Sequence, residues 1–220
     1  MPNYNIKISN QKRDGILSYI NTMKNNGPFT VVDVGGSIRG WSASVIDALV
    51  DINDCPNKEG GVKHFKCDIT HPDSWKEILE YVEKNGKFDF CICTHTLEDI
   101  FNPIDILKIL PTIAKSGVIS MPSANTEFSR CENPHWLGYI HHRWIFDHND
   151  TTMLIIPKIS VLEALCGNRL LYKKAQEEIR YEWETSIPYT LFMDNYLGPS
   201  AAAVINHYTA LIETIYNRKL

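Results

Sequence analysis

The sequence predicts an α/β fold built on one mostly parallel sheet, and three observations lead to this fold class. Short apolar segments at 29–34, 88–93 and 118–121 have the composition of buried strands. Helical patterns alternate with them, most clearly between Pro72 and Gly86. In a chain of 220 residues this alternation favours a single domain over 1–220, with helices on both faces of a doubly wound central sheet.

An amphipathic helix is expected near the N-terminus, over about residues 5–26. Apolar side chains recur there at helical spacing, at Ile16, Leu17, Ile20 and Met23. Gly27 and Pro28 then stop the pattern. The apolar stripe predicts that this helix packs against the sheet.

The region of about 28–123 is expected to form the core of the sheet. After the strand at 29–34, the segments 43–47 and 64–68 are predicted as two further strands that each end in an aspartate. The helix that opens at Pro72 follows them, and the strand at 88–93 comes next.

The second half of this core region contains one more helix and one more strand. Asn102-Pro103 is typical of a helix start, and Pro111 is expected to kink that helix. Lys115-Ser116-Gly117 has the composition of a helix C-terminal cap, after which 118–121 is predicted as a strand.

The region of about 124–220 is expected to elaborate the same domain. Two apolar segments, 143–146 and 151–156, flank polar residues and predict an antiparallel hairpin. Ile179, Tyr181 and Trp183 alternate with charged residues, as in a strand, and a last helix is expected from about residue 200.

Composition excludes several functional classes. The net charge of −4 gives no basic field for a nucleic-acid backbone or an anionic membrane. The chain shows no signal-peptide pattern and no apolar run of membrane-spanning length, so we expect a soluble cytoplasmic protein. The six cysteines lack paired metal spacing, which favours reduced, buried thiols.

The end of the first core strand has the features of a ligand site. Asp33 precedes Gly35 and Gly36, and glycine lets the backbone come close to whatever lies above the sheet. Asp47 is placed to accept hydrogen bonds from two ribose hydroxyls, and Asp68 from an exocyclic amine. Together these residues predict an adenosine site.

These motifs are similar to those of the class I S-adenosylmethionine-dependent methyltransferases. The resemblance rests on Asp33-Val34-Gly35-Gly36-Ser37 and on the loop Thr94-His95-Thr96-Leu97-Glu98-Asp99 after the fourth strand, and it covers about 28–123. The stretch 133–146, with Gly138-Tyr139-Ile140-His141-His142-Arg143-Trp144, resembles a subgroup associated with glycan or small-molecule biosynthesis. The resemblance implies a Rossmann-like sheet and S-adenosyl-L-methionine as cofactor.

The resemblance also implies roles for individual residues. The expected cofactor-binding set is Asp33, Gly35, Gly36, Ser37, Asp47, Asp68, Ile69, Thr94 and His95. A histidine suits the general base of an O-methyl transfer, with His141 or His142 preferred and His95 in reserve. Arg143 is expected to bind an anionic group of the acceptor, and Glu98 and Trp144 to line the acceptor site.

The expected partner is a small-molecule acceptor, such as a sugar or nucleotide-sugar, and a homodimer stays open. No metal site is expected, because the spacing of His135, His141, His142 and His148 is unspecific. Two alternatives remain. One is a noncatalytic methyltransferase-like binding or dimerisation module, and the other is a nicotinamide-dependent reductase. The reductase ranks lower, because Asp47 follows the glycines too soon for a dinucleotide fingerprint.

Overall fold

The computed structural model describes residues 6–9, 13–54, 61–149, 152–166, 178–192 and 200–217. They form two compact units. Unit 1 contains the described residues up to Met121 together with Arg180–Pro188, and unit 2 contains those of Pro122–Ile179 and Tyr189–Leu220. The boundary lies close to residue 124, where the sequence predicted an elaboration of a single domain. That single-domain assignment stays a prediction.

Unit 1 is built on a seven-stranded sheet with the order β1-β9-β6-β5-β2-β3-β4. The strands are β1 (Ile6–Ser9), β2 (Val31–Val34), β3 (Ala48–Asp51), β4 (Lys63–Lys66), β5 (Phe88–Thr94), β6 (Ala114–Pro122) and β9 (Glu178–Glu184). The pairs β2·β3, β3·β4, β2·β5 and β5·β6 are parallel, whereas β1·β9 is antiparallel. The predicted α/β class with a mostly parallel sheet is therefore confirmed.

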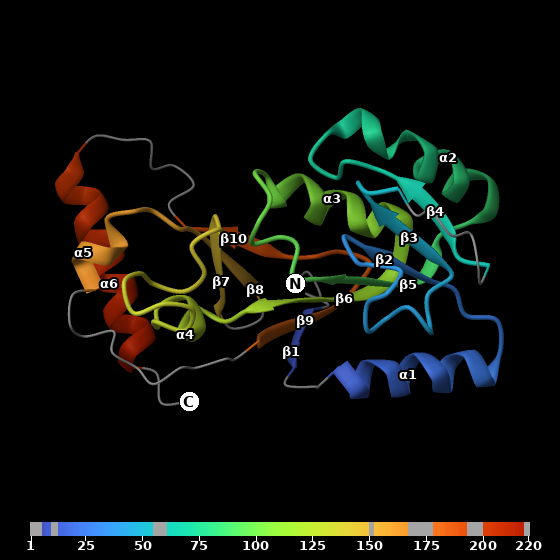
Figure 1. Cartoon of the computed structure of the whole chain (residues 1–220), viewed down its shortest axis with the longest axis horizontal. Helices are drawn as coiled ribbons and strands as arrows, with labels where there is room; N and C mark the ends of the chain where they lie inside the picture. Colours follow the sequence, from blue (N-terminus) through green and yellow to red (C-terminus); the bar gives the residue numbers. More distant parts are fainter. Residues whose placement is uncertain are drawn as a thin grey trace, which may run out of the picture. The chain divides into compact units, whose positions relative to one another are not determined.

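Helices cover both faces of this sheet (Figure 1). One face carries α1 (Arg13–Asn26), and the other carries α2 (Lys76–Asn85) and α3 (Pro103–Ile113). Ile16 and Ile20 of α1 are buried in a core cluster with the strand residues Val31, Leu49, Phe90, Ile92 and Val118. The apolar stripe of α1 therefore packs on the sheet as predicted.

The N-terminal prediction is corrected at its start. Residues 6–9, which the sequence placed in a helix over about 5–26, form the edge strand β1, and the helix begins at Arg13. The partner strand β9 is far away in sequence, with Ile6 opposite Trp183. A strand of four residues is too short to show a clear alternation of apolar and polar residues, and its pairing partner is distant in sequence. Its sequence alone therefore did not predict a strand.

The second predicted strand is also misplaced. Residues 43–45 lie in turns, and β3 starts at Ala48. The whole segment is apolar, since Val45 and Ile46 are as buried as the residues of β3 itself. The turn and the strand after it are therefore both buried, and local hydrophobicity did not distinguish one from the other.

The other core elements agree with the prediction. Pro72 opens the 3-10 turn η1 (Pro72–Trp75), which leads into α2, and Gly86 ends α2 with a φ of 85°. The side chain of Asn102 caps α3 by accepting from the Ile104 N–H. Lys115-Ser116-Gly117 is the exception, because it belongs to β6 and not to a helix cap.

Unit 2 contains a three-stranded sheet with the order β10-β8-β7. Its elements are α4 (Ala124–Glu127), β7 (Trp144–Asn149), β8 (Thr152–Pro157), α5 (Leu162–Cys166), β10 (Tyr189–Leu191) and α6 (Ala201–Asn217). The predicted hairpin is confirmed as the antiparallel pair β7·β8, although β7 extends through Asp147 and His148, which were expected in its turn.

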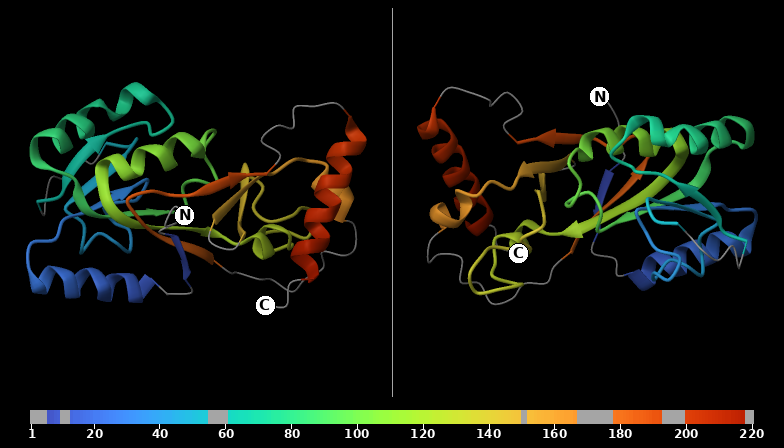
Figure 2. Two further views of the ribbon diagram at one scale, coloured as in Figure 1. Left: turned by 180° about the vertical axis from the view of Figure 1, so that it is seen from behind. Right: turned by 45° about the horizontal axis from the view of Figure 1, so that its top comes forward.

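Helix α6 closes the core of unit 2. It lies beside α5 in both views of Figure 2. The buried residues of its predicted apolar face are Tyr208, Leu211, Ile212 and Ile215, and they pack with Ile145 and Ile156 of the hairpin. Such packing explains why this stretch forms a helix as predicted.

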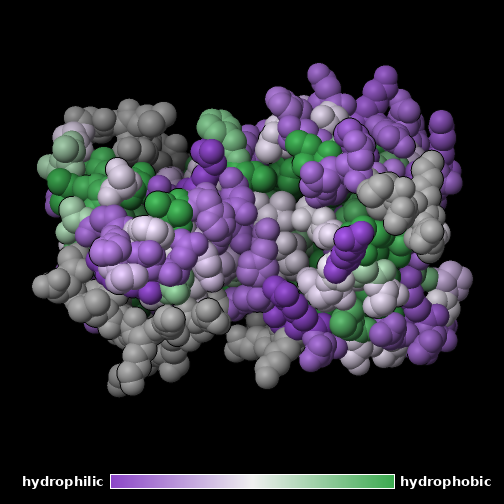
Figure 3. All heavy atoms as spheres, viewed as in Figure 1, coloured by the Kyte–Doolittle hydropathy of each residue, from purple (hydrophilic) through white to green (hydrophobic). Residues whose placement is uncertain are grey.

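The outer face of α2 is hydrophilic (Figure 3), since its charged side chains are exposed.

Among the described residues, no helix has the length and apolar character needed to cross a membrane.

Candidate functional site

The carboxyl edge of the unit 1 sheet contains a topological switch point. From β2 the chain proceeds outward to β3 and β4, and it then returns to β5 and β6 on the other side of β2. The loops that follow β2 and β5 therefore leave the sheet in opposite directions. In open parallel sheets such a point is where ligands bind.

Asp33 lies on β2 near this edge and is 2% exposed. Ser42 Oγ donates a short hydrogen bond to Asp33 Oδ2, while Oδ1 is buried without a hydrogen bond among the described residues. Burial raises the pKa of Asp33 to about 6, and the Ser42 hydrogen bond partly opposes this rise. Asp51 is close enough to raise the pKa of Asp33 further.

The two glycines after β2 make room for protein side chains. A Cβ atom at Gly35, which has a φ of 75°, would lie 2.5 Å from Thr96 Cγ2. A Cβ atom at Gly36 would overlap the carboxylate of Asp33. Gly35 therefore allows close packing of the loops after β2 and β5, and Gly36 makes room for the Asp33 carboxylate. Both roles differ from the clearance for a ligand that the sequence suggested. Ser37 is exposed on the same loop.

Asp47 lies at the wrong edge of the sheet for the ribose contact predicted from the sequence. It directly precedes β3, so it sits at the amino ends of the strands. Its carboxylate accepts from the Val31 N–H at 2.8 Å and from Lys24 Nζ at 2.8 Å. Asp47 thus fastens α1 to the start of β2, and its assignment to the cofactor is corrected.

Asp51 occupies the place that was expected for Asp47. It is the last residue of β3, and the pairing of Val34 with Val50 puts Asp51 level with Gly35. Its side chain is partly exposed, and Oδ1 accepts from the Asn53 N–H at 2.7 Å. The apolar residues Ala48-Leu49-Val50, which are followed by this acid, are the sequence pattern that could have indicated the strand end. The next residue, Ile52, is 55% exposed.

Asp68 follows β4 at the same edge, as the sequence predicted. Its side chain is 32% exposed, and Oδ1 accepts from Thr70 Oγ1 at 2.6 Å and from the Thr70 N–H at 3.0 Å. These hydrogen bonds lower the pKa of Asp68 below its ordinary value. The adjacent Ile69 is partly exposed, and its carbonyl accepts from Trp75 Nε1.

The loop after β5 brings Thr94, His95 and Glu98 to the switch point. Thr94 ends β5, and its carbonyl accepts from Thr96 Oγ1 at 3.1 Å. His95 has a φ of 51°, a left-handed conformation that is uncommon outside glycine. His95 Nδ1 lies 3.3 Å from Oε1 of Glu98, whose side chain is only 2% exposed.

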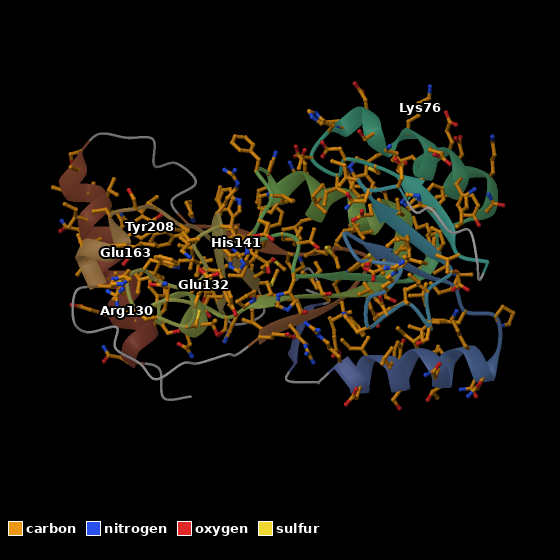
Figure 4. All side chains as sticks on the ribbon, viewed as in Figure 1. Lys76, Arg130, Glu132, His141, Glu163 and Tyr208 are labelled. Carbon is orange, nitrogen blue, oxygen red and sulfur yellow. The ribbon has the colours of Figure 1, made fainter. Side chains whose placement is uncertain are left out.

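Unit 2 presents the other predicted residues on the segment from Glu127 to Trp144. Two glutamates, labelled in Figure 4, accept hydrogen bonds from this segment. Glu132 Oε2 accepts from Trp136 Nε1 at 2.8 Å and from the Ile140 N–H at 3.2 Å. Glu163 Oε1 accepts from the Leu137 N–H at 2.6 Å. The segment is therefore fixed at several points without regular secondary structure.

His142 is buried within this segment and pairs with Glu127 through a 2.7 Å contact between Nδ1 and Oε1. The other oxygen of Glu127, Oε2, accepts from Lys158 Nζ at 2.7 Å. Neither Glu127 nor Lys158 was singled out from the sequence, because both are distant from His142 along the chain. His141 and Arg143 are exposed, and Trp144 begins β7 half-buried. Their predicted roles towards an acceptor remain predictions.

Apart from Asp47, each predicted site residue thus lies in one of two groups. Unit 1 gathers Asp33, Gly35, Gly36, Ser37, Asp68, Ile69, Thr94, His95 and Glu98 around the carboxyl edge of its sheet. Unit 2 holds His141, His142, Arg143 and Trp144. Searches against models of known protein families find no match, and no curated protein is similar enough to be a relative.

Proposed function

We propose that the chain is a cytoplasmic S-adenosylmethionine-dependent methyltransferase whose cofactor site is the carboxyl edge of a Rossmann-like unit 1. One observation carries the proposal. The chain leaves β2 and β5 in opposite directions at this edge. At the same edge, β3 ends in the partly exposed Asp51, and the partly exposed Asp68 lies two residues after the end of β4. Ligands of open parallel sheets bind at such a position.

The side chains at this edge suit an adenosine. The Asp51 carboxylate has acceptor capacity beyond its bond from Asn53, so it can accept from a ribose diol. Ile52 offers an exposed apolar surface for a planar base. Asp68, one strand further out, can accept from an exocyclic amine of that base. This order along the sheet matches ribose followed by base.

Asp33 contributes to the same site from below. Its carboxylate accepts from Ser42 Oγ, and its second oxygen is buried at the base of the loop without a hydrogen bond among the described residues. A buried, uncompensated carboxylate costs stability, and such groups concentrate at functional sites. The loop backbone at Gly35 and Gly36 is partly exposed above it.

When bound, S-adenosylmethionine supplies a methyl group activated by its sulfonium, which leaves this chain to orient the acceptor and remove its proton. A histidine suits that proton transfer near neutral pH. Of the three histidines expected from the sequence, His95 lies in the same unit as the proposed cofactor edge, with Glu98 3.3 Å from its Nδ1. His141 and His142 belong to unit 2.

The proposed acceptor is a hydroxyl of a small molecule, such as a sugar or nucleotide-sugar. The exposed Arg143 guanidinium can bind a phosphate or carboxylate of that acceptor in a bidentate manner. The half-buried Trp144 next to it offers an aromatic surface for a sugar ring. The acidic net charge does not favour a nucleic-acid acceptor.

The proposal is tested by calorimetric titration of the chain with S-adenosylhomocysteine. The wild-type chain should bind, and Asp51→Asn should weaken binding about tenfold to a hundredfold, since hydrogen bonds to a charged group contribute about 1.5–3 kcal/mol. Asp47→Asn is the matched control at the opposite edge, and it should leave the affinity unchanged. Circular dichroism establishes that each variant is folded.

Two results would contradict the proposal. One is the absence of binding by the folded wild-type chain, which would favour the noncatalytic module. The other is an affinity that depends on Asp47 and not on Asp51. A rise in melting temperature with a nicotinamide dinucleotide in place of S-adenosylhomocysteine would favour the reductase.

A further inference from the structure

Two buried carboxylates of unit 1 have oxygens that accept no hydrogen bond among the described residues. Asp33 on β2 is 2% exposed, and the oxygen concerned is Oδ1. Glu98, on the loop after β5, is 1% exposed, and both of its oxygens are in this position. His95 Nδ1 lies 3.3 Å from Glu98 Oε1. Within the described part of the chain, no lysine or arginine forms an ion pair with either carboxylate.

The two carboxylates act on the same part of the sheet. In the parallel pair β2·β5, Asp33 lies level with Ile92, so Cys93 is the next residue towards the carboxyl edge. Burial raises the pKa of the Cys93 thiol, and the negative charges of Asp33 and then Glu98 raise it further. Burial and the nearby Asp51 raise the pKa of Asp33 itself to about 6. Negative charge is therefore concentrated where β2 and β5 end.

Such a place favours a ligand that carries positive charge. A buried carboxylate oxygen without a hydrogen bond has lost its water and gained no partner, which costs free energy. A cation that binds nearby offsets this cost, because the interior of a protein screens the attraction between charges less than water does. The buried oxygens of Asp33 and Glu98 therefore fit a cofactor with a positively charged centre at this edge.

The proposed orientation of the adenosine brings one particular cation to this place. With the base towards β4 and the ribose at the end of β3, the 5′ carbon lies at the other end of the ribose ring and points towards β2 and β5. The sulfur of S-adenosylmethionine is bonded to this carbon and is a sulfonium cation. In S-adenosylhomocysteine the same sulfur is a neutral thioether, and the other charged groups of the two compounds are the same.

We propose that Asp33 and Glu98 make the carboxyl edge selective for the sulfonium charge, so that the chain binds S-adenosylmethionine more tightly than S-adenosylhomocysteine. The inference rests on the proposed function, because it concerns the same site. The carboxylates need no direct contact with the sulfur, since buried charges interact over several ångströms. In the transfer the sulfur keeps the electron pair of its bond to the methyl carbon and becomes neutral. The product thereby loses this attraction and dissociates more easily.

Calorimetric titration of the full chain with each compound at pH 8, where carboxylates are ordinarily ionised, gives the ratio of the two dissociation constants. The wild-type chain should bind S-adenosylmethionine at least about tenfold more tightly, which corresponds to about 1.4 kcal/mol. Asp33→Asn and Glu98→Gln keep the shape of each side chain and remove its charge. Each should lower the ratio, and together they should bring it close to one by weakening the binding of S-adenosylmethionine. Asp47→Asn, at the opposite edge, is the charge-matched control and should leave the ratio unchanged.

A wild-type ratio of one or below, with both compounds bound, would overturn the inference and leave the proposed function intact. A folded double variant that keeps the wild-type ratio would do the same, and so would an equal fall in Asp47→Asn. A loss of affinity that is equal for both compounds would also overturn it, because the carboxylates would then act on a group that the two share. If circular dichroism shows that the double variant does not fold, the single variants provide the same test. Binding of neither compound would defeat the proposed function, and the inference with it.

Discussion

Each unit buries a glutamate beside a histidine, but among the described residues only the glutamate of unit 2 also forms an ion pair with a lysine. In unit 2, Glu127 lies between His142 and Lys158 at 2.7 Å from each. In unit 1, both oxygens of Glu98 are buried without a hydrogen bond among the described residues, and His95 Nδ1 is 3.3 Å away. Asp33 likewise has one buried oxygen without a hydrogen-bond partner in the described part of the chain.

The difference separates two uses of a buried carboxylate. A compensated carboxylate such as Glu127 holds structure and orients a side chain. Buried carboxylate oxygens without a hydrogen bond among the described residues, as in Asp33 and Glu98, cost stability. Such groups are more frequent at functional sites, so they agree with the proposed cofactor site at the edge of unit 1.

The largest expected effect comes from removing the cation that compensates Glu127. Lys158→Met should lower the free energy of unfolding by about 3–5 kcal/mol, because it leaves a buried carboxylate without its cation. Lys24→Met is the matched control, since Lys24 contacts Asp47 at a similar 2.8 Å but with 41% of the Asp47 side chain exposed. Loss of that partly exposed pair should cost less than about 1 kcal/mol.

Chemical denaturation measures both values. Equal losses in the two variants would contradict the distinction between a buried and a partly exposed ion pair, and so would a Lys158→Met chain as stable as the wild type.

Asp33 gives the next largest effect, and it depends on pH. Its pKa in the fold is about 6, against an ordinary value of 3.8, so the fold favours the protonated form. The stability from Asp33 is thus complete below about pH 4 and is lost as the pH rises through about 6. At pH 7 Asp33→Asn should be more stable than wild type by about 3 kcal/mol, at about 1.4 kcal/mol per pKa unit.

Unfolding free energies of the wild type and Asp33→Asn, measured from pH 4 to pH 7, test this sign. The difference between the two should grow with pH. A difference that is constant with pH, or one that favours the wild type at pH 7, would show that burial does not raise the pKa of Asp33.

Gly138 gives a smaller effect, specific to unit 2. Gly138→Ala places a Cβ against Glu127 and should lower the free energy of unfolding by about 1–3 kcal/mol more than Gly86→Ala does. Gly86 is the matched control, because its φ of 85° is also left-handed but nothing lies within 4 Å of its Cβ position. Thermal melts compare them, and equal losses would leave Gly138 with a purely conformational role.

The smallest effect is expected at Glu98. Glu98→Gln removes a charge whose oxygens accept no hydrogen bond among the described residues, so the free energy of unfolding should stay within about 1 kcal/mol or rise. The same replacement at Glu127 should be clearly destabilising. A loss above about 2 kcal/mol at Glu98 would show that its charge is compensated after all.

The sequence predicted the fold wherever local pattern and burial coincide. The strand before Gly35 and the helix from Pro72 were predicted because apolar spacing and turn residues mark them. Asp47 was misassigned, because the apolar run on either side of it continues into β3 and shifts the strand end to Asp51. A shift of four residues moved the predicted ribose contact to the opposite edge of the sheet.

The sequence predicted those residues of the candidate site whose position follows from a neighbouring strand. Asp68 lies two residues after β4 and His95 directly after β5, so their position at the carboxyl edge could be predicted from the sequence. Glu127 and Lys158 meet His142 only because the fold of unit 2 joins residues that are distant along the chain. The pairing of β1 with β9 was missed for the same reason.

A crystal structure of the chain grown with S-adenosylhomocysteine tests most directly whether the carboxyl edge of unit 1 binds the proposed adenosyl cofactor. We predict that the ribose hydroxyls donate to Asp51 and that the adenine lies against Ile52 with its amine towards Asp68. Density for the nucleoside beside Asp47, or an empty edge at saturating S-adenosylhomocysteine, would contradict the account.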